Sequence, residues 1–150
     1  MNVEVRNREL GRKSGLRVNT RLLKTLAGQT LELAGASASY NLSIVLVNDA
    51  LMAKLNAQYH DAEGPTDILT FDYGSGQGEL IISVDHVIAN ARRFRTTAAR
   101  ELARYVAHGI LHLHGYDDRT PRQRTRMRAA EHRLMNRVAQ SVHLTDLVRQ

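Results

Sequence analysis

The sequence has no cysteine and no tryptophan, and only two prolines among its 150 residues. Without cysteine the chain can form neither a disulfide framework nor a thiolate zinc site, so a metal would have to be held by His, Asp or Glu. No apolar run approaches the ~20 residues of a membrane-spanning helix, and the first eight residues are polar, unlike the start of a signal peptide. We therefore expect a cytoplasmic protein with no membrane partner.

Lysine is also scarce, because 18 of the 21 basic residues are arginine, and the formal net charge is +6. The basic residues gather at the two ends of the chain. Residues 1–32 contain seven Lys/Arg and three Asp/Glu, residues 33–91 one and seven, and residues 92–150 thirteen and five. Two interpretations stay open: a surface that attracts a polyanion such as nucleic acid, or exposed helix positions that are simply filled by arginine.

A length of 150 residues is typical of one domain, and no repeat, linker or change of composition divides residues 1–150. Alternating or continuous apolar residues predict strands over residues 1–6, 40–47 and 79–83, with a hairpin connection over 73–78. Helical spacing and capping residues predict helices over 18–33, 49–59 and 84–91, a fourth that begins after Thr97, and a fifth opened by Thr120 and Pro121. This order predicts an α+β fold: a single domain with a mixed sheet of about four strands and packed helices. The spacing of residues 108–118, described next, makes the fourth of these helices a zincin-like metal-binding helix.

The stretch from His108 to Asp118, His-Gly-Ile-Leu-His-Leu-His-Gly-Tyr-Asp-Asp, has the spacing of a metal site. His108 and His112 are four residues apart, so on a helix their imidazoles project from one face and can bind one Zn²⁺. Gly115 can end that helix in the left-handed conformation and turn the chain back toward the same ion. The zincin pattern H-E-x-x-H-x-x-G-x-x-H has its glycine and third ligand at these offsets, and aspartate is an acceptable ligand. The stretch therefore predicts three protein ligands, His108, His112 and Asp118, with an open fourth position.

Other polar residues near this stretch are expected to have different roles. His114 follows His112 by two residues and would point to the opposite side of the helix, so it is a poor third ligand. Asp117 is a candidate to orient one of the ligand histidines through a hydrogen bond. Apart from His60, the histidines elsewhere in the chain are expected at the surface: His86, His132 and His143.

The residue after the first histidine separates this stretch from the zinc peptidases. In those enzymes it is the glutamate that serves as general base, and here it is Gly109, so a peptidase mechanism loses its proton acceptor. The stretch resembles H-G-x-L-H-L-x-G-Y-D-H, the signature of the YbeY endoribonucleases, and matches it everywhere except the last position. There the family has its third histidine and this chain has Asp118.

A second stretch carries the same resemblance. YbeY-like chains have L-N-x-x-Y-R followed by T-D-V-L-S-F, a loop that runs into a strand along the active-site cleft. His60 stands here where the family has an arginine. Core packing or a capped loop would also explain most of the shared residues. The residues that match are Leu55, Asn56, Tyr59, Thr66, Asp67, Leu69 and Phe71.

The resemblance implies a metal-dependent, single-strand-specific endoribonuclease that acts in rRNA maturation and ribosome quality control. It implies single-stranded rRNA and the small ribosomal subunit as partners, one Zn²⁺ or another divalent metal per chain, and no small-molecule cofactor. It also implies that the ligand helix packs near the centre of the sheet. Because the arginine of the family faces the cleft, His60 is the candidate catalytic residue that contacts a substrate phosphate.

Two other functions stay open from the sequence. One is a metal-dependent hydrolase of another ester or amide, which fits the zinc-like spacing but lacks the glutamate of the peptidases. The other is a ribosome-associated factor of the same fold with weak or lost catalysis, which the changes at His60 and Asp118 allow.

Overall fold

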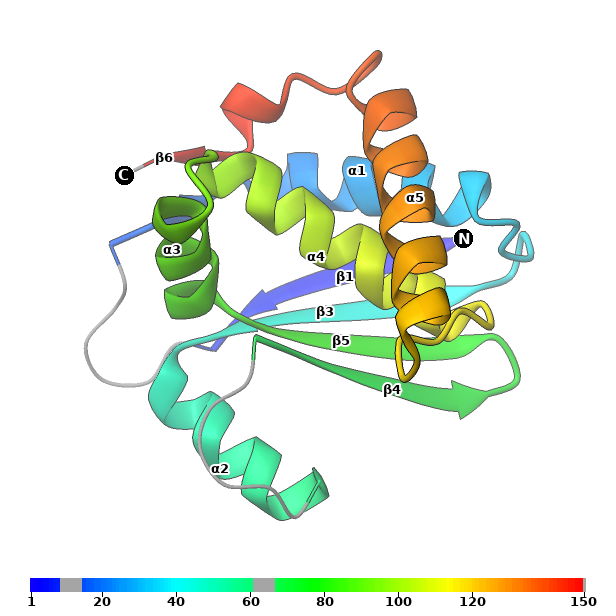
Figure 1. The fold of residues 1–150 in the computed structure, drawn as a ribbon, viewed down its shortest axis with the longest axis horizontal. Helices are drawn as coiled ribbons and strands as arrows, with labels where there is room; N and C mark the ends of the chain where they lie inside the picture. The colour runs from blue at the N-terminus through cyan, green and yellow to red at the C-terminus, as the bar shows by residue number, and fades with distance from the viewer. Residues whose placement is uncertain (9–14, 61–66, 150) are drawn as a thin grey trace.

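The computed structural model describes residues 1–8, 15–60 and 67–149, with only the backbone of His60. Four strands form a mixed sheet in the order β1-β3-β5-β4, in which β3 runs parallel to both neighbours and β4 is an antiparallel edge strand (Figure 1). The prediction of a mixed four-stranded sheet with packed helices is therefore confirmed. In chain order the elements are β1 (Asn2–Asn7), β2 (Arg17–Val18), α1 (Thr20–Leu33), β3 (Asn41–Val47), α2 (Asp49–His60), β4 (Ile68–Gly74), β5 (Gln77–Ser83), α3 (Val84–Arg93), α4 (Ala98–Leu113), α5 (Pro121–Val138), a 3-10 turn (Leu144–Asp146) and β6 (Val148–Arg149).

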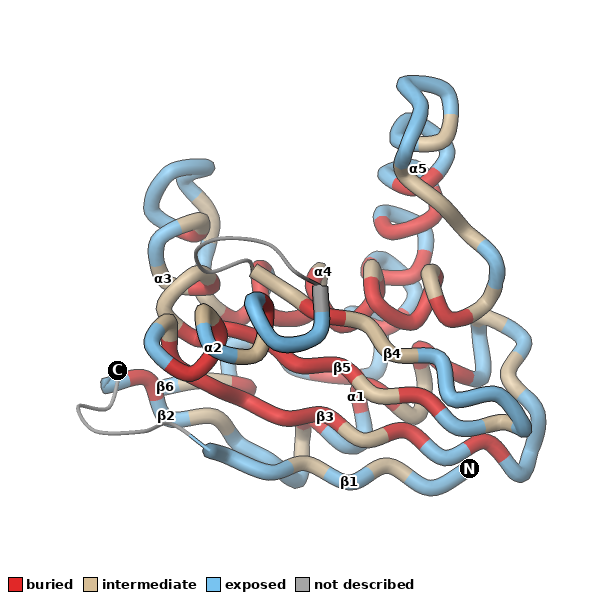
Figure 2. The backbone as a smooth tube through the Cα atoms, turned by 90° about the horizontal axis from the view of Figure 1, so that it is seen from below, coloured by how far each residue is buried: buried red, intermediate tan, exposed pale blue. Residues whose placement is uncertain are grey.

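Helices cover both faces of this sheet. Strand β3 is central, and its consecutive residues Ile44 to Val47 are all buried, as expected of a strand with apolar contacts on both sides. One face packs against α1 and α4 and belongs to the larger core, whereas α2 covers the other face with a smaller apolar cluster. Figure 2 shows this arrangement: buried residues concentrate in β3, β5 and α4, and β1 at the edge is mostly exposed or intermediate.

The N-termini of four helices are capped by Asn or Thr side chains, and two of these caps, Thr97 and Thr120, were named from the sequence. Side-chain oxygens accept hydrogen bonds from the backbone N–H three residues later at Asn19 (3.0 Å), Asn48 (3.1 Å), Thr97 (3.1 Å) and Thr120 (3.1 Å). At Thr120 the reciprocal bond from the side chain of Gln123 completes a capping box, with proline at the first helical position. These caps set where α1, α2, α4 and α5 begin, and so fix where their side chains face.

The first helix begins at Thr20, after its cap Asn19, so Val18 lies outside it. Val18 pairs with Val148 in a small antiparallel sheet formed by β2 and β6, and the N–H of Asn19 bonds to the carbonyl of Leu147 at 2.8 Å. This pairing joins residues from opposite ends of the chain, so the local pattern around Val18 gives no sign of it. Within the described residues, no helix is long and apolar enough to cross a bilayer.

Helix α4 lies unusually close to the sheet at Gly109. A Cβ atom at this position would lie 2.5 Å from Leu80 Cδ2 in β5 and 3.0 Å from Ile68 Cδ1 in β4. Glycine is therefore required for the helix to approach the sheet this closely. The apolar stripe predicted for this helix is buried as expected: Leu102, Val106, Ile110 and Leu113.

Candidate metal centre

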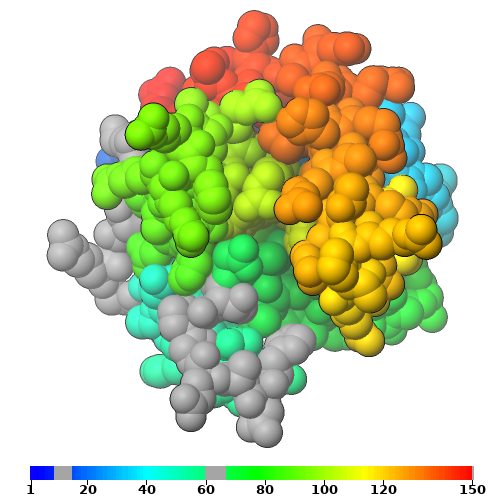
Figure 3. Space-filling view, in the orientation of Figure 1, coloured from blue at the N-terminus to red at the C-terminus, as the bar shows by residue number. Residues whose placement is uncertain are grey.

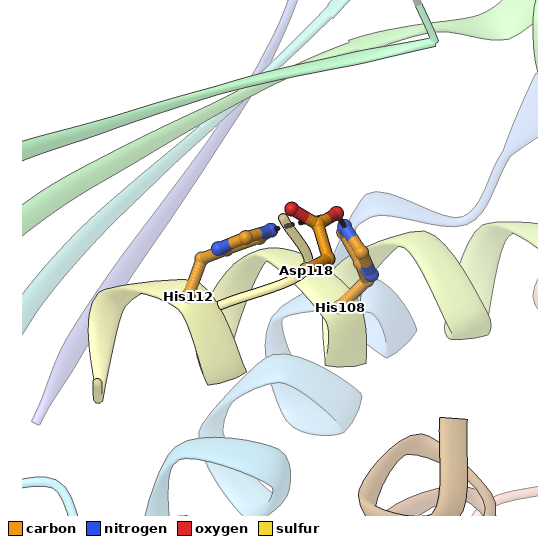
Figure 4. Close-up of side chains that lie close together, drawn as sticks. All are labelled: His108, His112 and Asp118. Carbon is orange, nitrogen blue, oxygen red and sulfur yellow. Dashed lines mark ion pairs between the residues drawn. The ribbon is translucent and has the colours of Figure 1, made fainter. Parts of the chain in front are cut away.

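Three polar side chains meet at the C-terminal end of α4. His108 Nε2 lies 3.5 Å from Asp118 Oδ2, and His112 Nε2 lies 3.4 Å from the same oxygen, so the carboxylate stands between the two imidazoles (Figure 4). One ligand atom from each residue lies within 4.8 Å of the others. The sequence predicted this convergence, because the two histidines share a helix face and the following turn reverses the chain.

The turn after α4 has the hydrogen bonds of a Schellman motif. Gly115 has a φ of +98°, its N–H bonds to the carbonyl of His112 at 3.3 Å, and the N–H of Tyr116 bonds to the carbonyl of Leu111 at 3.0 Å. Arg124 of α5 donates to the backbone carbonyl of Asp118 at 3.4 Å. These contacts satisfy the end of the helix and hold Asp118 over the two histidines.

The distances fit a single small cation. Ligand atoms that bind one tetrahedral ion at about 2.1 Å lie about 3.4 Å apart, close to the two observed nitrogen–oxygen separations. The side chains are 20% (His108), 24% (His112) and 41% (Asp118) exposed. The group is therefore partly buried and still accessible to solvent. Two imidazoles and a carboxylate are a common donor set for zinc and other divalent transition metals.

A buried glutamate from α5 orients the first histidine. Glu131 Oε2 lies 2.6 Å from His108 Nδ1, and Glu131 is only 4% exposed. This contact places the ring proton on Nδ1 and leaves the lone pair of Nε2 directed at the centre. The expected partner, Asp117, has another environment: its Oδ1 accepts from the N–H of Asp118 at 2.9 Å, and its Oδ2 lies 3.5 Å from Arg119 Nε. The prediction for Asp117 is therefore wrong, and Glu131 fills that role.

Arg104 connects this glutamate to a second buried carboxylate. Its Nε and Nη2 donate to the two oxygens of Glu101 at 2.8 and 3.1 Å, and its Nη1 lies 3.6 Å from Glu131 Oε1. The hydrogen bonds to Glu101 raise the pKa of Arg104 above its usual value, against the opposing effect of burial. A buried carboxylate is stable only when it is paired, and Arg104 pairs with both of these glutamates.

The position of a peptidase general base is closed in this fold. A side chain at residue 109 would point into Leu80 and Ile68 of the sheet, so any residue larger than glycine would overpack this contact. A glutamate at this position would have to displace the buried side chain of Leu80 and that of Ile68. The structure thus gives a steric reason for the difference from the zinc peptidases.

The other predicted residues lie apart from the three-residue group. His114 Nδ1 donates to the carbonyl of Ile110 (2.8 Å), and the His114 ring packs against Tyr40, so this histidine is not a third ligand, as expected. His86 was expected at the surface, but it is half-buried, with Nδ1 2.7 Å from Asp49 Oδ1, so that expectation is wrong. This contact joins the first turns of α2 and α3.

The candidate substrate contact is only partly placed. His60 is the last residue of α2, and its side chain lies outside the described residues, as does Thr66. The role of His60 therefore stays a prediction. Sequence reasoning also missed Glu131 and Arg104. The only local sign of Glu131 is its place on the apolar face of α5, where a glutamate stands between the buried residues Met127 and Leu134.

Comparison with known proteins gives a consistent family. The model of the family described as Endoribonuclease YbeY matches residues 7–139. An Endoribonuclease YbeY of Roseiflexus castenholzii is 34% identical over 131 residues, which cover 79% of this chain and 82% of that protein. Another, of Chlorobium luteolum, is 41% identical over 93 residues, covering 60% and 68%. The solution structure of TM1509 from Thermotoga maritima has a TM-score of 0.63 and 28% identity, covering 91% of this chain and 88% of that one.

Proposed function

Because the chain belongs to the Endoribonuclease YbeY family, we propose that it is a metal-dependent endoribonuclease. In this proposal it cleaves single-stranded rRNA during maturation of the small ribosomal subunit and during ribosome quality control. The observation that carries the proposal is the convergence of His108, His112 and Asp118 at separations that suit one divalent ion. We assign one ion per chain, zinc or a related divalent metal, and no small-molecule cofactor.

The residues of the centre have distinct tasks in this proposal. His108, His112 and Asp118 would hold the ion, and Glu131 fixes the tautomer and the orientation of His108. When bound, such an ion lowers the pKa of a water molecule and stabilises negative charge on a phosphoryl oxygen. His60 is assigned to a substrate phosphate, on the basis of its place in the sequence pattern.

Asp118 affects which ion suits this centre. A carboxylate brings a formal negative charge, so the ion is less electrophilic than it would be beside three neutral imidazoles. Carboxylate oxygen is also harder than imidazole nitrogen, which shifts preference somewhat toward ions such as Mn²⁺ without excluding Zn²⁺. We therefore expect the metal preference of this protein to differ from that of a centre with three histidines.

The test is a cleavage assay combined with metal analysis. Purified protein is examined by elemental analysis and incubated with single-stranded and double-stranded RNA, with and without a chelator, and again after Zn²⁺ or Mn²⁺ is returned. We expect cleavage of the single-stranded substrate alone, loss on chelation and recovery with metal. An active protein that is indifferent to the chelator would refute metal dependence.

One alternative keeps a specific observation in its favour. His60 and Asp118 both depart from the family pattern, which supports a ribosome-associated factor with weak catalysis. Such a protein would bind its metal and single-stranded RNA but cleave it no faster than a His112→Ala variant. Hydrolysis of another ester or of an amide has less support, because the structure closes position 109 to a general base.

A further inference from the structure

A hollow next to the candidate metal centre lies between α4 and α5. Figure 3 shows it as a depression flanked by α3 and α5, with α4 at its floor. Its volume is about 450 Å³. The lining residues that matter for its chemistry are Phe94, Arg100, Arg104, Arg128, Glu131 and His132.

The hollow and the metal centre are parts of one surface. Glu131 lines the hollow, and its Oε2 lies 2.6 Å from His108 Nδ1. On α4, Arg100, Arg104, His108 and His112 follow each other at intervals of four, so they form a single stripe. Because eight helical residues span about 12 Å, Arg100 lies about that far along the axis from His108.

Helix α5 presents a matching stripe. Arg124, Arg128 and His132 are also four residues apart, and Arg124 contacts the carbonyl of Asp118 while the other two line the hollow. The two stripes therefore begin at the candidate metal centre and end in the hollow. For the arginines of these two stripes, this arrangement favours the first interpretation left open by the sequence, a surface that attracts a polyanion.

The charge that the hollow offers to a ligand is positive. Its two carboxylates, Glu101 and Glu131, are each 4% exposed and both contact Arg104. Arg100 and Arg128 are exposed, and within residues 1–8, 15–60 and 67–149 neither forms an ion pair. The three arginines of the hollow, Arg100, Arg104 and Arg128, outnumber its two carboxylates. The exposed guanidinium groups among them suit an anionic ligand such as a phosphate.

An aromatic side chain stands at the rim of the hollow. Phe94 is 60% exposed, one of the few large apolar side chains that the described residues leave in solvent. The guanidinium carbon of Arg93 lies 5.2 Å from the centroid of its ring. An exposed ring beside arginine side chains is the combination that proteins use to stack nucleic-acid bases while binding the backbone.

We propose that this hollow binds the RNA segment next to the scissile phosphate. Arg100 and Arg128 contact backbone phosphates, and Phe94 stacks on a base. The inference rests on the proposed function, and it adds where the strand lies on the protein: from the candidate metal centre along the groove between α4 and α5, toward the end of α3. Arg104 serves chiefly to hold Glu101 and Glu131, so it is left unchanged in the test.

The test compares two double charge reversals of equal size. Arg100→Glu/Arg128→Glu alters the hollow, and Arg133→Glu/Arg137→Glu alters exposed positions on the far side of α5. Binding is measured by fluorescence anisotropy with a labelled single-stranded RNA long enough to cross the hollow. Because long-range electrostatics change equally, a difference between the variants reports local contact. We expect the hollow variant to bind on the order of ten-fold more weakly than the control variant.

Two further measurements separate phosphate contacts from stacking. In Arg100→Ala/Arg128→Ala, the slope of log affinity against log salt should fall in magnitude by about 1.4, since each lost phosphate contact removes about 0.7 on single strands. Phe94→Ala should weaken binding about five-fold or more, whereas Phe94→Tyr, which keeps the ring, should retain it. Circular dichroism melts of each variant serve as the control for an intact fold, and we expect them to match the melt of the unmodified protein.

A dinucleotide substrate distinguishes the inference from the proposed function. It occupies only the scissile position, so the hollow variants should cleave it as fast as the unmodified protein while they cleave the longer RNA more slowly. If the hollow and control variants bind the longer RNA equally, the inference is overturned and the nuclease assignment stands. If the unmodified protein neither binds nor cleaves single-stranded RNA, the proposed function fails and the inference fails with it.

Discussion

Helices α4 and α2 pack on opposite faces of the same sheet, and they are held very differently. Eleven of the sixteen residues of α4 are buried, so its two ligand histidines project from a helix that the core fixes on several sides. In α2 the buried residues among those described are Leu51, Met52 and Asn56, and residues 57–59 of its last turn are exposed. We infer that metal binding depends on core packing and that the substrate contact assigned to His60 does not.

The largest expected effect is the loss of a ligand supported by α4. Asp118→Ala should lower metal affinity by more than the ~100-fold that loss of a hydrogen-bonded outer partner can cause, because a ligand itself is removed. Asp118→His should keep the metal, provided the longer side chain fits, and should favour zinc more strongly. Elemental analysis of the three proteins after dialysis decides this. Full occupancy in the alanine variant would show that Asp118 is not a ligand.

The next effect concerns the close approach of α4 to the sheet. Gly109→Ala places a methyl group 2.5 Å from Leu80 Cδ2, so it should destabilise the protein by about 1–3 kcal/mol through overpacking. Gly28→Ala is the matched control: Gly28 lies within α1, and a Cβ there would meet no atom within 4 Å. It should stabilise the protein by about 0.5–1 kcal/mol. Urea denaturation curves would contradict the packing argument if both variants shifted in the same direction.

A smaller effect is expected at the residue that orients a ligand. Glu131→Gln keeps the shape of the side chain but removes the charge beside His108, so metal affinity should fall about 10- to 100-fold. Asp117→Asn, which changes a carboxylate that contacts Arg119 and the N–H of Asp118, should leave metal affinity unchanged. Competition with a chromophoric chelator measures both. A greater loss in the Asp117 variant would restore the role that the sequence suggested for it.

The contrast between Glu131 and Asp118 also explains what the sequence could predict. The place of Asp118 beside the two histidines could be predicted, because all three residues belong to one local unit. In that unit, helix spacing and the glycine at the helix end determine where the three side chains point. Glu131 contacts His108 only because α5 packs on α4, and the angle between two helices is set by tertiary packing rather than by residue spacing. The pairing of β2 with β6 was missed for the same reason, since its partners come from opposite ends of the chain.

The smallest expected effect is at His60, the last residue of α2, on the face of the sheet opposite α4. The family pattern has an arginine at this position. Arginine is a permanent, bidentate phosphate donor, whereas histidine is only partly protonated near neutral pH. His60→Arg should therefore raise or at least maintain affinity for single-stranded RNA, and His60→Gln, which has no charge, should lower it. Because the neighbouring residues of the last turn of α2 are exposed, we expect both variants to stay within about 0.5 kcal/mol of the original stability and to keep their metal. RNA binding, metal content and urea midpoints measured on the same samples test this. Loss of metal from His60→Arg would show that His60 is itself a ligand, and that the face covered by α2 contributes to the metal centre after all.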